Sequence, residues 1–394
     1  YYSKKDIQMI NNIRIWGIDG IDEGTIRQAE RVARLPILAG PVVLLPDAHI
    51  GTGATIGTVI ITENAIVASI TGVDIGCGII VSKTDLTASQ LPDDMQPLVS
   101  QFERSIPAGV GRSRNIDSQG KSDRYIMDCA SKWLRDNPHP LEDKLQKIVL
   151  PQLGTLGSGN HFVEVCLNEG DEVFVMLHSG SRGVGNQLAQ KHINIARQQK
   201  LDIEDRDLSW FVGGTPEFDA YISDMLWCQA YALENRQLMM WAATNDLFQF
   251  VGHGRVTQTI QCHHNFAVKE HHGGKEVWVT RKGAIRAEKG DMGIIPGSMG
   301  TKSYIVEGLG NADSYNSAPH GAGRRLSRGQ AKREFTVDSL KEMMGSRALN
   351  KNQPLALLDE HPQAYKDIEG VIESSKDLVR PIHTLRSIVN YKGV

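Results

Sequence analysis

The spacing of apolar residues predicts a chain in which strands and helices are mixed. A short apolar run at 13–16 predicts a strand, and helical spacing over 25–35 predicts a helix with Thr25 as its N-cap and Pro36 just beyond its end. From 42 to 81, β-branched runs alternate with glycine, which predicts closely packed strands at 42–45, 58–61 and 65–68.

The remaining pattern predicts an α+β fold. Residues 86–150 are expected to be mostly helical, and 217–248 is predicted as a long helix with Thr215 as cap and Pro216 in the first turn. Further strands are predicted at 172–177, 276–280 and 387–391, helices near 336–345 and 367–378, and a loop-rich block up to Arg328. Because no steady βαβ alternation appears, we expect one large domain over 1–394, with mixed β-sheets around a central cleft, flanking helices and a mainly helical insertion near 200–250.

Composition narrows the class of protein. The chain has 394 residues, of which 40% are hydrophobic and 23% charged, as in globular proteins. No apolar run approaches the roughly 18 residues of a membrane span, and residues 1–5 lack the apolar core of a signal peptide, so we expect a cytoplasmic protein without membrane contact. A net charge of −3 gives no global electrostatic case for nucleic acid, although a local basic surface stays possible.

Four short segments concentrate side chains that can bind metal. They contain Asp74 and Cys77 in GVDIGCG, His161 in GSGNH, His178 in HSGSRG, and His263 and His264 in CHHN. Each segment alone has an ordinary explanation, such as a tight turn or a structural histidine. Together they repeat one pattern, a ligand-type residue within a loop of small residues. Mixed sulfur, nitrogen and oxygen donors suit Mn, Fe, Co or Zn better than Mg or Ca.

The cysteine count indicates that any functional cysteine acts alone, as a metal ligand or as a nucleophile. Five are present, an odd number, and no CxxC pair occurs, which argues against a disulfide framework and a zinc ribbon. One aspartate, one cysteine and three histidines exceed the needs of one tetrahedral ion, whereas a thiolate that bridges two ions would use them all.

Two further segments could hold phosphate. His320 precedes a glycine turn followed by Arg324 and Arg325, and a loop around Ser298 is rich in hydroxyl and backbone N–H donors. Such loops can form anion-binding concavities, although no Walker A motif is present. The alternative is a pair of irregular surface loops.

The assembled motifs resemble the RtcB family of RNA-splicing ligases. The matching segments, in order, are LPDAHIGTGATIGTV, GVDIGCG, GTLGSGNHFVE, LHSGSRGVGN, HHNF, VTRKGAI, GIIPGSMGTKS, SAPHGAGR and a closing YKG. They extend from about residue 45 to the C-terminus, and the combination of GVDIGCG, GNH and HGAGR is far more specific than a lone glycine motif.

The resemblance implies a set of site residues. Two Mn²⁺ ions would be held by a five-residue set in which Cys77 bridges: Asp74, Cys77, His161, His178 and His264. His320 would be guanylated. Asn160 and Asn265 would contact phosphates, Glu164 and Lys392 would hold guanine, and Ser298 would belong to the nucleotide pocket. Arg182, Arg324 and Arg325, with Lys302 nearby, are candidates for RNA phosphates, the alternative being exposed solubilising charge.

The resemblance also implies an activity. The implied activity is that of a GTP-dependent RNA ligase, which would join 3′-phosphate or 2′,3′-cyclic phosphate ends to 5′-hydroxyl ends through histidine–GMP and a 3′-guanylated RNA, in RNA repair or tRNA splicing. An archaease-like protein is a candidate activator. A dinuclear Mn-dependent phosphodiesterase without a covalent guanylate is the alternative enzyme, and an RNA-binding protein that has kept only the fold is the third hypothesis.

Overall fold

The computed structural model describes residues 7–118, 120–199, 201–350 and 354–393. Residues 1–5, which were predicted to lack the apolar core of a signal peptide, lie outside this set. Strand pairing is antiparallel throughout the described residues except for two parallel pairs, β2 with β3 and β17 with β18. The predicted α+β class, with mixed sheets and flanking helices, is confirmed.

A six-stranded sheet forms one half of the fold. Its order is β1 (Ile7–Ile10), β2 (Ile13–Trp16), β3 (Val42–His49), β4 (Ile56–Thr62), β12 (Lys275–Lys282) and β11 (Asn265–His272). Helix α1 (Glu23–Ala33) packs on β3. The predicted cap of this helix was wrong: Asp22 is the N-cap, because its carboxylate accepts from the backbone N–H of Thr25.

A larger sheet forms the other half. Its order is β10 (Val256–His263), β6 (Gly78–Thr87), β8 (Glu172–Ser179), β7 (Phe162–Leu167), β18 (Val379–Lys392), β15 (Ser303–Gly308) and β14 (Met292–Ile295), with β17 (Ala348–Leu349) beside β18. His264 is the single residue between β10 and β11. The two sheets are therefore joined directly at that residue.

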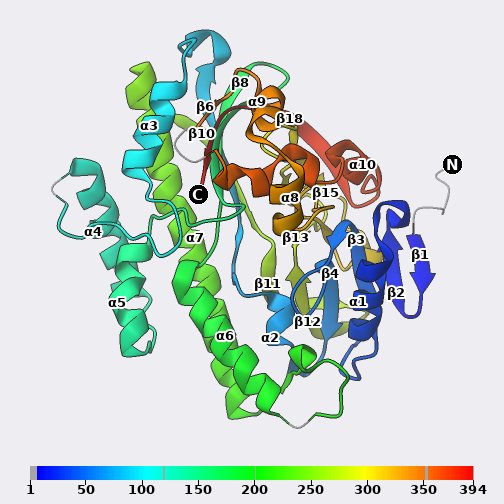
Figure 1. Ribbon diagram of the computed structural model, residues 1–394. Helices are drawn as coiled ribbons and strands as arrows, with labels where there is room; N and C mark the ends of the chain where they lie inside the picture. Colours follow the sequence, from blue (N-terminus) through cyan, green and yellow to red (C-terminus); the bar gives the residue numbers. More distant parts are fainter. Residues whose placement is uncertain (1–6, 119, 200, 351–353, 394) are drawn as a thin grey trace.

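Helices cover the larger sheet (Figure 1). The longest, α7 (Pro216–Val251), packs on β8 and β6 and is contacted by α3 (Gln96–Ser105), α4 (Lys121–Asp136) and α6 (Arg182–Gln198), with α5 (Asp143–Gln152) beside α4 and α6. The side chain of Thr215 caps α7 and Pro216 occupies its first turn, as predicted. Within the described ranges, none of the helices combines the length and apolarity that a bilayer span requires.

Several predicted boundaries were wrong. The predicted strand at 65–68 is only β5 (Ala65–Ile66), which pairs with β9 (Phe211–Val212), and α2 (Ala68–Thr71) follows it. The loop-rich block contains β13 (Ala284–Arg286) and β16 (Ser317–Pro319) besides β14 and β15, and it leads into α8 (Arg328–Glu334).

The C-terminal boundaries also differ. Helix α9 (Val337–Met344) lies where a helix was predicted, but α10 (Ile368–Glu373) stops before 378. A turn ends it, in which the backbone N–H groups of Leu378 and Val379 donate to Ser375 O. Strand β18 begins at Val379, eight residues before its predicted start, because its first half pairs with β15 in a contact between segments distant in sequence.

Candidate metal and nucleotide site

Four residues of metal-ligand type meet where the ends of several strands of the larger sheet come together. Each lies at or beside the end of a strand: Cys77 precedes β6, His161 precedes β7, His178 is the penultimate residue of β8 and His264 follows β10. Neighbouring strands here are antiparallel, and His178 is in register with both Ile79 and Phe162. The beginnings of two strands and the ends of two others therefore converge on one place.

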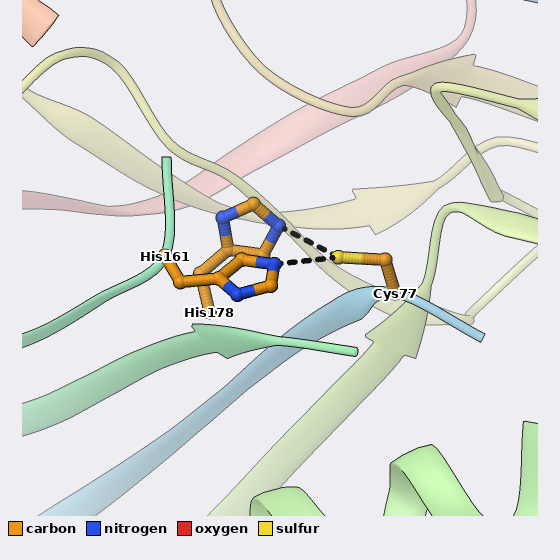
Figure 2. A group of neighbouring side chains, drawn as sticks. All are labelled: Cys77, His161 and His178. Carbon is orange, nitrogen blue, oxygen red and sulfur yellow. Dashed lines mark hydrogen bonds between the residues drawn. The ribbon is translucent and has the colours of Figure 1, made fainter. Parts of the chain in front are cut away.

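Their side chains form a continuous row. Asp74 Oδ2 lies 3.2 Å from His161 Nε2, which lies 3.4 Å from Cys77 Sγ. On its other side, Cys77 Sγ lies 3.2 Å from His178 Nε2, which lies 2.9 Å from His264 Nε2. Figure 2 shows the sulfur facing the Nε2 atoms of both His161 and His178. The thiol is thus common to two overlapping groups of donors.

The histidines present their Nε2 lone pairs to this row. His161 Nδ1 lies 2.9 Å from Leu156 O, and His178 Nδ1 lies 3.1 Å from Asn160 O. Because a carbonyl only accepts, each Nδ1 carries the hydrogen and each Nε2 is left without one. Burial lowers the pKa of His178 and of His264 well below the usual value, so both rings are neutral, the form that binds metal.

The donor set fits a divalent transition-metal cation. Burial, followed by the charge of Asp74, raises the pKa of the Cys77 thiol, so a thiolate at this position needs a cation beside it. Burial would raise the pKa of Asp74, but its contact with His161 and the charge of Arg182 lower the pKa to about 2. His264 Nδ1 is buried and has no partner within the described part of the chain. One thiol, one carboxylate and three imidazoles suit Mn, Fe, Co or Zn.

His320 lies next to this row. Its ring centroid is 4.9 Å from that of His264. Asp47 Oδ2 lies 2.6 Å from His320 Nδ1 and accepts the backbone N–H of the same residue at 3.0 Å. Asp47 is fully buried within β3, and its carboxylate keeps the hydrogen of the ring on Nδ1. The lone pair is therefore on Nε2, the nitrogen that can act as a nucleophile.

A cavity of about 530 Å³ opens on one side of His320. Four of the five residues predicted to bind nucleotide line it, namely Asn160, Glu164, Ser298 and Lys392. The Ser298 backbone N–H donates to Thr301 Oγ1, which holds the loop in a tight turn. The volume is within the range of small-ligand pockets.

Buried charges shape the floor of this cavity. Burial raises the pKa of Glu164 to about 7, against the opposing charge of Lys392. Burial would also raise the pKa of Glu360, but the charges of Lys392 and Arg328 lower it to about 2. Lys392 Nζ lies 3.2 Å from Glu360 Oε2 and 5.1 Å from the centroid of the Phe162 ring. Acceptor, donor and aromatic face are thus side by side.

A second cavity of about 220 Å³ lies beside the row of side chains that extends from Asp74 to His264. Its lining includes Asp74, Asn265 and Lys282, and it shares Asn160, His264 and His320 with the first cavity. Asn265 was predicted with the nucleotide contacts, but it lines this second cavity and not the first, and its side chain accepts the backbone N–H of Gly283. His320 is therefore accessible from two sides.

Residues 28–393 match the family described as tRNA-splicing ligase RtcB. The chain belongs to the RtcB family. It is 40% identical over 384 residues to the RNA-splicing ligase RtcB of Escherichia coli K12, with 93% of each chain covered. The tRNA-splicing ligase RtcB of Pyrobaculum aerophilum is 32% identical over 422 residues, covering 89% of this chain and 87% of that protein. That of Nanoarchaeum equitans is 29% identical over 447 residues, covering 95% and 93%.

The arginines that the RtcB resemblance suggested for RNA lie in different settings. Arg182 is largely buried, and its guanidinium lies so close to Gly157 that a Cβ there would overlap it at 1.9 Å. Arg324 donates to Glu360 and to the Tyr365 hydroxyl in the wall of the first cavity. Arg325 is exposed and donates to Gln363 O. Of these three, Arg325 alone is on the open surface.

Other arrangements in this RtcB-family chain were not predicted from the sequence. The contact of Asp47 with His320 was missed, although a carboxylate within the apolar run 42–48 was a usable signal. Glu360 carried no such signal, because its partners Lys392 and Arg324 are distant in sequence. Lys302, named beside the arginines, is exposed and paired with Glu369.

Proposed function

We propose that this chain is a GTP-dependent RNA ligase that joins RNA 3′-phosphate or 2′,3′-cyclic phosphate ends to 5′-hydroxyl ends. The observation that carries the proposal is the His320–Asp47 pair between the metal-type row and the first cavity. The family match over residues 28–393 supports treating this stretch as one catalytic unit. RNA splicing and tRNA splicing, which the names of the relatives give, are the processes in which we place it.

Two Mn²⁺ ions are the proposed cofactors. Asp74, Cys77 and His161 would hold one ion, and Cys77, His178 and His264 the other, in keeping with the two overlapping groups of donors. Bound cations would withdraw charge from the phosphoryl oxygens of the substrates. The donor chemistry supports a transition metal, and the choice of manganese comes from the family resemblance.

The proposed first step forms a bond between His320 and GMP. Nε2 attacks the α-phosphorus of GTP, the N–P bond forms, and the bond from that phosphorus to the bridging oxygen breaks as pyrophosphate leaves. Asp47 keeps the Nδ1 hydrogen in place and stabilises the positive charge that develops on the ring. Glu164 and Lys392 would recognise guanine, and Asn160 and the Ser298 loop would contact the phosphates.

Two further transfers complete the proposed reaction. An oxygen of the RNA 3′-phosphate attacks the guanylate phosphorus and the N–P bond breaks, which gives a 3′-guanylated RNA end. The 5′-hydroxyl oxygen then attacks the 3′-phosphorus, GMP leaves and the hydroxyl proton is released. A 2′,3′-cyclic end would first be opened by water. The second cavity supports this scheme, because it gives an RNA end its own approach to His320, with Asn265 and Lys282 on its wall.

Labelling with GTP tests the proposal. Wild-type protein incubated with α-³²P-GTP and Mn²⁺ should retain the label on denaturing gels, and His320→Ala should not. An RNA pair with one 3′-phosphate and one 5′-hydroxyl end should then be sealed. If wild-type protein cleaves phosphodiesters but takes no label, the alternative of a dinuclear phosphodiesterase replaces the ligase.

A further inference from the structure

The middle of helix α7 touches the loops that carry the metal-type residues. Gly76, next to Cys77, has a φ of 72° and lies so close to the helix that a Cβ there would be 2.8 Å from Gln229 Cα and 3.0 Å from Ala232 Cβ. The loop backbone therefore rests on the helix surface. One turn further along α7 come two polar residues, Asn235 and Arg236, which are fully buried.

Arg236 contacts three of the loops. Its Nη1 donates to Gly76 O at 2.7 Å and to Ser179 O at 3.0 Å. Its Nη2 lies 3.1 Å from His263 Nδ1. His263 Nδ1 also lies 2.8 Å from Gly76 O, so the imidazole and the guanidinium both contact this carbonyl. No carboxylate of the described residues lies within ion-pair distance of this guanidinium, which is unusual for a buried charge.

Asn235 contacts the fourth loop and one of the three already named. Its Oδ1 accepts from Gly154 N at 2.8 Å and Thr155 N at 3.2 Å. Its Nδ2 donates to Thr155 O at 3.2 Å and to Gly180 O at 3.1 Å. Donor and acceptor of the amide are both used, so the side chain is fixed in one orientation.

The contacted positions lie beside the metal-type residues. Gly76 precedes Cys77, Ser179 follows His178, and His263 precedes His264. Thr155 precedes Leu156, whose carbonyl accepts from His161 Nδ1. We infer that Asn235 and Arg236, here called the α7 clamp, are positioning residues. They hold the four loops that carry the candidate metal ligands at the spacing that two cations require. This inference rests on the metal site proposed above.

The physical reason is preorganisation. The four loops come from segments separated by up to 187 residues, as the His263–Gly76 contact shows, and they are rich in glycine. Without a common anchor, the loops would lose conformational freedom when a cation binds, and this loss would weaken its affinity. A side chain of a 36-residue helix is a rigid anchor. Residues that orient ligands without touching the metal typically change affinity by roughly 10- to 100-fold.

The test uses the full chain, stripped of metal with a chelator, and Mn²⁺ or Co²⁺ alone as probe. The variants are Arg236→Lys, which keeps the charge but loses the planar fork, Arg236→Gln, and Asn235→Ala. Arg281→Lys and Arg281→Gln are matched controls, because Arg281 is also fully buried yet bonds to Glu270 and Ser317 instead of the metal loops. Calorimetric titration gives affinity and stoichiometry, and the cobalt–thiolate absorption reports on Cys77.

We expect the clamp variants to bind both cations roughly 10- to 100-fold more weakly, or to lose one of them, with an altered cobalt spectrum. The control variants should keep wild-type affinity even where they lower the melting temperature of the metal-stripped protein. Variants that unfold without metal are replaced by Arg236→Lys, the mildest change. Unchanged metal affinity in Arg236→Lys and Asn235→Ala would overturn the clamp, and so would an equal loss in the Arg281 controls.

The same experiment separates the clamp from the ligase chemistry. If wild-type protein binds two cations and the clamp variants do not, but GTP never labels His320, the clamp stands and the proposed ligase fails. If labelling occurs and all variants bind metal like wild type, the ligase stands and the clamp fails. Wild-type protein that binds no transition metal overturns both.

Discussion

Replacement of Asp47 by asparagine should slow guanylation of His320 without removing metal. The carboxylate accepts from the His320 ring at 2.6 Å and from its backbone at 3.0 Å. An asparagine can turn its NH₂ group to Nδ1, which would move the ring hydrogen to Nε2 and block the nucleophilic nitrogen. Even with the original orientation, the developing positive charge would lose its ionic partner.

The magnitude follows from the hydrogen bond. A bond to a charged group contributes about 1.5–3 kcal/mol. At about 1.4 kcal/mol per factor of ten, loss of that contribution in the transition state slows the step roughly 10- to 150-fold. The buried Asp47 Oδ1 has no partner among the described residues, so the second oxygen offers no compensating contact.

The assay is single-turnover formation of labelled protein from α-³²P-GTP, with manganese content measured in parallel. Asp22→Asn is the matched control, because Asp22 lines the same cavity but caps α1, a role that asparagine also fills. The control should label at the wild-type rate. A labelling rate for Asp47→Asn within twofold of wild type, at equal metal content, would refute the role assigned to this carboxylate.

Three further outcomes are expected. His320→Ala should abolish labelling and retain metal, and loss of all metal, measured by elemental analysis, would contradict a purely nucleophilic role. Cys77→Ala should lose or weaken both cations, since the thiol is shared, whereas full retention of one ion would argue against bridging. Burial raises the pKa of Glu164 to about 7, so the folded chain keeps a proton that the unfolded chain releases above about pH 4.5. Its contribution to stability therefore falls as pH rises from about 4.5 to 7, and urea unfolding of metal-stripped Glu164→Gln should show a smaller fall than wild type; an identical pH dependence would exclude this assignment.

Local pattern was enough to predict the elements that depend on neighbours in sequence. Thr215 and Pro216 begin α7 as predicted, because capping and the first-turn preference of proline involve only a few adjacent residues. The grouping of ligand-type residues into small-residue loops was also visible, since donor chemistry belongs to the residues themselves. The motifs that carry the RtcB resemblance are likewise short and contiguous.

Contacts between distant segments were decided by the tertiary structure. Strand β18 gains its first half from pairing with β15. The proximity of Cys77, His161 and His178 comes from the antiparallel register of three neighbouring strands.

The partners of buried polar side chains could not be predicted from the sequence either. Asp47 contacts His320, which is 273 residues away in the sequence, and Arg236 contacts Gly76, which is 160 residues away. A buried polar group must find a partner, but which partner it finds depends on how the sheets and α7 pack. The amino-acid pattern thus determined which chemistry the chain carries, and packing decided which atoms stand close enough to perform it.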